Sequence, residues 1–257
     1  MLQIRDKQMA AFERAARQRF EERLVERARK NFPRFVEIVG DKAVGSAVHK
    51  GYSRAETHEL RSEREICLFV DVAIMLGSGF DTDPQLPWAA AILADEKLSS
   101  PLARAETLHE RAMGYLDEVV GEGQVFPLGA FLGVRKRACE ELERRLGRNL
   151  EREALTLFGE VWPAKSNYVG ESALLGLVEQ ARASAARYGI TTSAGVGIYA
   201  LFAFVLGHGF GSDPLYPWVA EVLTSPEITA EGARIRRLYS TALAYINQAL
   251  GTTGAKG

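Results

Sequence analysis

The second half of the chain repeats the first half at a constant offset, and this repeat constrains the fold more than any other feature. The stretch LGSGFDTDPQLPW, which begins at Leu76, returns as LGHGFGSDPLYPW from Leu206. Without a gap, residues 1–121 match residues 131–251 at 28 of 121 positions, and 11 of these matches lie between positions 73 and 93. The sequence therefore predicts two copies of one folded module.

The boundaries of the copies follow from this register. The first copy spans residues 1–121, a short connection spans 122–130, the second copy spans 131–251 and a tail spans 252–257. The connection, EGQVFPLGA, is short and partly apolar, so it predicts a packed joint. We expect one pseudo-symmetric unit, like a homodimer fused into one chain, with a translational stack of the copies as the alternative.

Apolar residues recur at helical spacing in both copies, and no alternating strand pattern is present, so we predict an all-α fold with roughly five helices per copy. The first helix should run from Ile4 to Phe32 and end at Pro33. Its predicted apolar face comprises Phe12, Ala16, Phe20, Leu24 and Ala28.

Capping signals mark the later helices. A second helix is expected at 41–57, and at 171–188 in the other copy. A third helix should begin after Ser62, which has Glu65 at capping-box spacing, and end at Leu76; its duplicate should begin at Thr192. A short helix opened by a proline should start at Pro87, and the last helix should span 101–120.

Several residues around the repeated loop have a structural interpretation. The aspartates precede prolines, so we expect them to cap backbone N–H groups of the loop or the next helix. The tryptophans and phenylalanines are predicted to be equivalent core anchors. These anchors are Pro33, Phe80, Asp83 and Trp88 in the first copy, and Pro163, Phe210, Asp213 and Trp218 in the second copy.

No motif in the chain predicts catalysis, a metal or a cofactor. His58-Glu59 begins like a zinc-binding HExxH motif, but position 62 is serine. The glycines of 207–211 resemble a dinucleotide fingerprint but follow a predicted helix instead of a strand. The other histidines (His49, His109 and His208) and both cysteines (Cys67 and Cys139) are interpreted as ordinary surface and core residues.

One segment of the second copy, residues 189–210, contains no Asp, Glu, Lys or Arg. A run of this length could span a bilayer. Its first third is rich in Gly, Ser and Thr, however, and no partner span accompanies it. We therefore expect a helix buried all round at the contact between the copies.

Charge and composition narrow the functional classes. The chain has 32 basic and 33 acidic side chains and a net charge of -1, which argues against binding nucleic acid through phosphate charge. The N-terminus lacks the apolar core of a secretory signal, and two cysteines cannot form a disulfide framework. A cytoplasmic protein without cofactors is the expectation, and membrane binding is not favoured.

The combination of MLQIRDKQM, Asn31-Phe32-Pro33 and EREICLFVDVAIMLGSGFDTDPQLPWAAAIL resembles small helical bacterial proteins associated with effector clusters of type VI secretion and related contractile injection systems. The resemblance covers mainly residues 1–120. It implies a non-catalytic accessory that binds a secreted effector or toxin, as adaptor, chaperone or immunity protein, and it implies no active-site residues.

Two alternatives remain open at this point: a pore-forming effector that inserts residues 189–210, and an enzyme with an unrecognised site. For the favoured hypothesis, loops that differ between the copies suit recognition of an asymmetric protein partner. The expected contact residues are Ser78, Asp81 and Thr82 in one loop, and His208, Ser212 and Tyr216 in the other loop.

Overall fold

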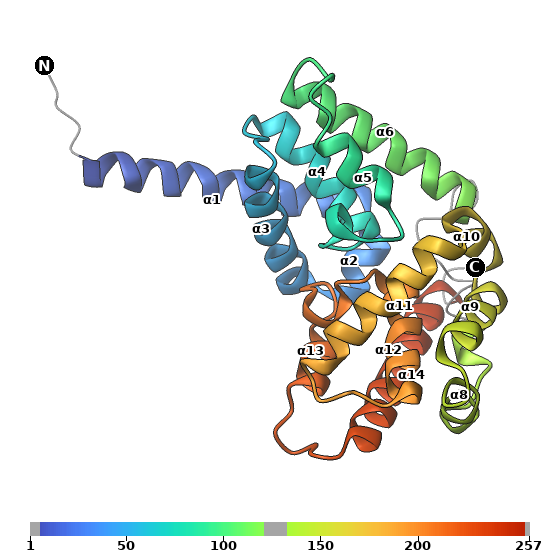
Figure 1. Ribbon diagram of the computed structural model, residues 1–257. Helices are drawn as coiled ribbons and strands as arrows, with labels where there is room; N and C mark the ends of the chain where they lie inside the picture. Colours follow the sequence, from blue (N-terminus) through green and yellow to red (C-terminus); the bar gives the residue numbers. More distant parts are fainter. Residues whose placement is uncertain (1–5, 121–132, 255–257) are drawn as a thin grey trace, which may run out of the picture.

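A computed structural model describes residues 6–120 and 133–254, and this part of the chain is helical, without a strand (Figure 1). The predicted all-α fold is therefore correct. The helices of the first copy are α1 (Asp6–Asn31), α2 (Pro33–Val39), α3 (Asp41–Thr57), α4 (Glu63–Leu76), α5 (Pro87–Leu93) and α6 (Pro101–Val120), with a short 3-10 helix, η1 (Phe80–Thr82), before α5.

In the second copy, five helices begin 130 residues after α2 to α6, in the same order. They follow two shorter helices that stand where the first copy has only α1. The helices are α8 (Cys139–Leu146), α9 (Leu150–Val161), α10 (Pro163–Val169), α11 (Glu171–Ala186), α12 (Ser193–Leu206), α13 (Pro217–Leu223) and α14 (Glu231–Gly254), with η2 (Phe210–Ser212) before α13. The predicted connection, 122–130, lies outside the described residues.

Most predicted helix starts are confirmed. The Ser62 side chain accepts from the Glu65 N–H, and the Glu65 carboxylate accepts from the Ser62 N–H, which completes the capping box of α4. Thr192 caps α12 in the same place. Helices α2 and α10 were not predicted from the sequence, because Pro33 not only ends the preceding helix but also occupies the first position of the next one.

The first helix differs from the prediction at its N-terminal end. Phe20, Leu24 and Ala28 are buried, as expected for the apolar face. Phe12 and Ala16 are exposed, because the first half of α1 projects beyond the other helices as a straight rod (Figure 1). The predicted apolar residues thus lie on one side of α1, but only those in its C-terminal half pack against other described residues.

The uncharged segment forms α12, whose residues from Gly195 to Leu206 are all buried. In place of the predicted burial at the contact between the copies, α12 packs mainly on α8, α9, α11 and α14 of its own copy. The physical reason is that α8, α9, α11 and α14 together cover α12 within its own copy, so its burial does not require contact with the first copy. In the described part of the chain, no helix is both long and apolar enough to cross a membrane.

The aromatic anchors are buried to different degrees. Phe80 and Phe210 are fully buried, with ring centroids 4.8 Å from Phe69 and 4.6 Å from Tyr199, respectively. Trp88 and Trp218 are only partly buried and pack against Tyr115 and Tyr245 of the last helix in each copy. Pro33 and Pro163 begin α2 and α10.

Candidate functional site at the junction of the two copies

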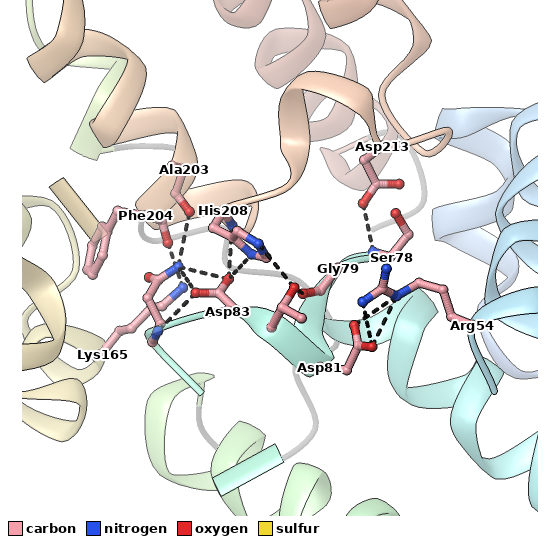
Figure 2. Close-up of polar contacts among 12 residues, drawn as sticks. Arg54, Ser78, Gly79, Asp81, Asp83, Lys165, Ala203, Phe204, His208 and Asp213 are labelled. Carbon is pink, nitrogen blue, oxygen red and sulfur yellow. Dashed lines mark hydrogen bonds and ion pairs between the residues drawn. The ribbon is translucent and has the colours of Figure 1, made fainter. Parts of the chain in front are cut away.

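The loops that follow α4 and α12 bind each other through two reciprocal hydrogen bonds (Figure 2). The Ser78 N–H donates to Asp213 Oδ2 at 2.7 Å, and the His208 N–H donates to Asp83 Oδ2 at 2.9 Å. Because Ser78 and Asp83 correspond to His208 and Asp213 in the repeat, each bond is the counterpart of the other. We call these two segments, residues 76–83 and 206–213, the junction.

The local sequence explains why both aspartates point across the junction. Each aspartate precedes a proline and forms a turn in which its Oδ1 accepts the N–H two residues later, from Gln85 at 2.9 Å and from Leu215 at 3.0 Å. The turn fixes the carboxylate, and its other oxygen remains for the partner copy. The predicted capping role is therefore present within the loop, with a second role across the junction that the sequence analysis did not predict.

Two glycines allow the backbones to approach closely. Gly77 and Gly207 have φ values of 97° and 96°, a conformation that side chains other than glycine rarely adopt. A Cβ on Gly77 would lie 3.3 Å from Leu206 O, and a Cβ on Gly207 would lie 3.1 Å from Leu76 O. Glycine is therefore required at both positions by the backbone conformation and by the neighbouring copy.

The two buried aspartates differ electrostatically despite their matching geometry. Burial acts to raise the pKa of Asp83, but His208, whose Nδ1 lies 3.4 Å from Asp83 Oδ2, and the more distant Lys165 hold this pKa below its usual value. For Asp213, burial dominates and raises the pKa, because its hydrogen bonds and Lys50 compensate less.

Lys165 adds a buried cation on one side only. Its Nζ donates to Phe204 O at 2.5 Å, and burial lowers its pKa to about 8 (Figure 2). The corresponding residue in the first copy is Phe35, which is also buried. The junction is thus symmetric in its backbone hydrogen bonds but asymmetric in charge.

A cleft of about 320 Å³ opens beside the junction, between α3 and α11. It draws corresponding residues from both copies, including Gly79 with Gly209 and Thr82 with Ser212. The other lining residues are Lys50, Arg54, Gln180, Ser184, Arg187, Tyr188, Tyr199, His208 and Gly211.

On the first-copy side, Arg54 is neutralised within the protein. Its guanidinium makes a two-pronged ion pair with the fully buried carboxylate of Asp81, with Nη2 to Oδ2 at 2.6 Å, and His58 Nε2 lies 2.8 Å from the same oxygen. This cluster lowers the pKa of Asp81 although burial acts to raise it. The Arg54 guanidinium is thereby held at the wall of the cleft.

The second copy has no carboxylate at the corresponding place. Asp81 corresponds to Gly211, and His58 corresponds to Tyr188, whose hydroxyl donates to the Gly211 carbonyl at 3.2 Å. A Cβ at Gly211 would come within 2.5 Å of the Tyr199 hydroxyl, so glycine is the residue that fits. This side of the cleft is lined by uncharged polar groups and by Arg187.

The cleft therefore has an excess of positive charge. Lys50 and Arg187 make no ion pair with any residue that the structure describes, whereas Arg54 is paired with Asp81. The Lys50 ammonium donates to Ser212 O at 3.2 Å, and burial lowers its pKa. Chemically, this arrangement can bind an anionic group such as a carboxylate.

Of the six residues expected to contact a partner, three line the cleft and three are buried. Thr82, His208 and Ser212 line the cleft. Ser78 and Tyr216 are buried, Ser78 in the junction, and Asp81 is buried beneath Arg54.

Three cations of the cleft were not predicted from the sequence: Lys50, Arg54 and Arg187. They lie on or next to α3 and α11, and their counterparts are Gln180, Ser184 and Thr57. A comparison of charges between the aligned copies could have found them, because each cation corresponds to a neutral residue in the other copy.

The two cysteine thiols, Cys67 and Cys139, do not line this cleft. Burial raises the pKa of both thiols, that of Cys139 to about 11, which lowers the thiolate fraction. Within residues 6–120 and 133–254, no group of three or more His, Cys, Asp or Glu side chains could hold a metal ion.

No protein-family model, curated protein or solved structure matches this chain.

Proposed function

We propose that this chain is a non-catalytic binding protein that takes an acidic segment of a partner protein into the cleft beside the junction. The observation that supports this most directly is the positive charge of Lys50 and Arg187, which form no ion pair with any described residue, in a cleft of about 320 Å³. That volume suits one or two acidic side chains of a peptide. The resemblance of the sequence supplies the class of partner, a secreted effector handled by an adaptor, chaperone or immunity protein.

The reciprocal junction supports a fused-homodimer arrangement of the copies. In a twofold contact, residue i of one subunit meets residue j of the other, and the reverse contact is also present. Ser78 with Asp213 and His208 with Asp83 follow this rule. We infer that a pseudo-twofold axis passes near Gly79 and Gly209, and that divergence around this axis made the cleft asymmetric.

Calorimetry tests the chemistry of the cleft. It compares the binding of a Glu-rich peptide with that of the same peptide carrying Gln at every Glu position. Only the acidic peptide should bind, and the affinity should fall as salt rises. Lys50→Gln installs the residue of the second copy and should weaken binding by about tenfold, as expected for one charge-assisted contact. Lys42→Gln, at an exposed position of the same helix, is the matched control. Equal effects of the two substitutions would contradict the proposed site.

A companion effector or toxin tests the class of partner. It should co-elute with the chain on size exclusion, and Arg187→Gln should weaken the complex while the thermal midpoint stays unchanged. Replacement of residues 208–216 by their first-copy counterparts is a less specific test, because aspartate at Gly211 would clash with Tyr199. Hydrolase or transferase activity of the purified chain, abolished by a single substitution that leaves the fold intact, would refute the non-catalytic role.

A further inference from the structure

The two copies differ most in their first helix. In the first copy α1 is continuous from Asp6 to Asn31, whereas the corresponding stretch of the second copy is broken into α8 and α9. The break lies at Gly147-Arg148-Asn149, where the Gly147 N–H bonds to Glu143 O and the Asn149 side chain accepts the Arg152 N–H. The first copy has Arg17-Gln18-Arg19 at these positions, which are good helix formers.

The break allows α8 to fold back onto its own copy. Cys139, Leu142 and Leu146 are buried against neighbouring helices, among which α12 makes the largest contact with α8. Gly197 makes the close approach possible, because a Cβ there would lie only 2.9 Å from the Leu146 side chain. The Arg236 guanidinium of α14 completes the contact with an ion pair to Glu143, at 3.3 Å.

The corresponding residues of the first copy are Met9, Phe12 and Ala16, and no described residue covers them in this way. Met9 is 48% exposed and Phe12 is 65% exposed, on the part of α1 that projects from the body in Figure 1. We call residues 8–19 the arm. A phenylalanine at this exposure, in register with a fully buried leucine of the other copy, indicates a contact that the described part of the chain does not make.

Contacts at the base hold the arm straight. The Arg17 guanidinium donates to Ser53 Oγ at 2.8 Å and to Glu56 at 3.3 Å, and it lies over the Tyr52 ring. Bending the helix here would lose these contacts and backbone hydrogen bonds. The arm is therefore directed away from α4 of its own chain, and its apolar face is available to another molecule.

On the α4 face that corresponds to the α8 site, residue sizes at one contact compensate for those of the arm. The first copy has Cys67 where the second copy has Gly197, and Ala16 where the second copy has Leu146. The receiving helix α4 thus carries a larger residue than α12, and the arm carries a smaller residue than α8. Cys67 and its neighbour Leu68 are both only partly buried. On α6, Met113 is 42% exposed.

We propose that two copies of this chain form a reciprocal dimer, in which the arm of each chain docks on the α4 and α6 face of the other as α8 docks on α12 and α14 within one chain. We take the partner to be a second molecule of this chain, because α8, the counterpart of the arm within the repeat, is docked on the equivalent face of its own copy. Exchange of an identical element between protomers is a common route to dimers.

One position of the contact is imperfect and therefore informative. Glu13 corresponds to Glu143, but Glu106 stands where the second copy has Arg236. Glu106 accepts instead from the Arg64 guanidinium at 2.6 Å. In the proposed dimer Glu13 of one chain lies near Glu106 of the other, so Glu13→Arg should tighten the dimer about fivefold or more.

Sedimentation equilibrium of the full chain tests the dimer. The wild type should dimerise, Phe12→Asp should weaken the dimer at least 30-fold, and Phe12→Leu, the residue of the second copy, should retain it. Replacement of Arg17-Gln18-Arg19 by Gly-Arg-Asn should let the arm fold back and give a monomer. A wild-type monomer at the highest concentration reached, or a dimer unaffected by Phe12→Asp, would overturn the proposal.

Disulfide trapping distinguishes docking between chains from docking within one chain. In a Cys139→Ser background, Ala16→Cys of one chain should cross-link to Cys67 of the other chain of the dimer. Oxidising conditions should then give a covalent dimer. Ala11→Cys, on another face of the same arm, should cross-link much less. An intramolecular Ala16→Cys cross-link, or equal dimer yields from both variants, would refute the proposed contact.

Discussion

Replacing the two junction aspartates one at a time should reveal their electrostatic difference. In Asp83→Asn and Asp213→Asn, one carboxylate oxygen becomes an NH₂ group, so one backbone N–H loses its acceptor. A hydrogen bond to a charged group contributes about 1.5–3 kcal/mol, and a buried donor left without an acceptor adds to the loss. We therefore expect Asp83→Asn to lower the free energy of unfolding by about 2–4 kcal/mol.

Asp213→Asn should cost less than Asp83→Asn, because it also removes a charge that burial destabilises. At about 2–4 °C per kcal/mol, the Asp83 variant should melt about 4–16 °C below the wild type. Urea unfolding and calorimetry of both variants measure the difference. Asp117→Asn, at an exposed position of α6, is the control and should be neutral. Equal losses at the two aspartates, or a larger loss at Asp213, would refute the reasoning.

The same pair has a predictable pH dependence. The pKa of Asp83 is lowered in the folded state, so its stabilisation is complete above the unfolded pKa of about 4 and is lost as pH falls through the folded pKa. The pKa of Asp213 is raised, so its protonation favours the folded state as pH falls through that higher pKa. The advantage of Asp213→Asn over Asp83→Asn should therefore shrink toward acid pH.

Three further substitutions test the backbone and the buried cation. Glu59, at φ 61°, stands where the second copy has Gly189, so Glu59→Gly should stabilise the protein by about 0.5–1 kcal/mol in urea unfolding, and a loss would contradict the strain. Gly207→Ala should cost about 1–3 kcal/mol, because the added Cβ would press on Leu76 O at a positive φ; a neutral result would contradict this. Burial lowers the pKa of Lys165 from 10.5 to about 8. The free energy of unfolding of the wild type should therefore rise by about 2 kcal/mol from this group between pH 7 and 9.5. Lys165→Met should abolish that rise in unfolding titrations.

Local sequence determined most of the helix starts. Caps such as Ser62 with Glu65, and prolines at the first helical turn, act through neighbouring backbone groups, so their effect needs no knowledge of distant contacts. The repeat determined the order of α2 to α6 and of α10 to α14, because equivalent residues favour equivalent local structure. The loop aspartates were identified for the same reason, since a turn of Asp before Pro is a local signal.

Only the tertiary structure decided what these elements contact. Asp83 and His208 are 125 positions apart, and their hydrogen bond depends on how the copies are placed in space. The cations Lys50 and Arg187 gain meaning from a cleft that the two copies form together. No local pattern encodes such a meeting, because it depends on which surfaces gain most free energy by leaving water.

The first helix shows this division most clearly. The sequence predicted one apolar stripe through Phe12 and Phe20, and the stripe exists. Tertiary structure buries Phe20 and leaves Phe12 exposed, while in the second copy the corresponding Leu142 is buried. A periodic pattern specifies which side of a helix is apolar, but the packing partner is chosen by the whole chain or, as we propose for the arm, by a second copy of it.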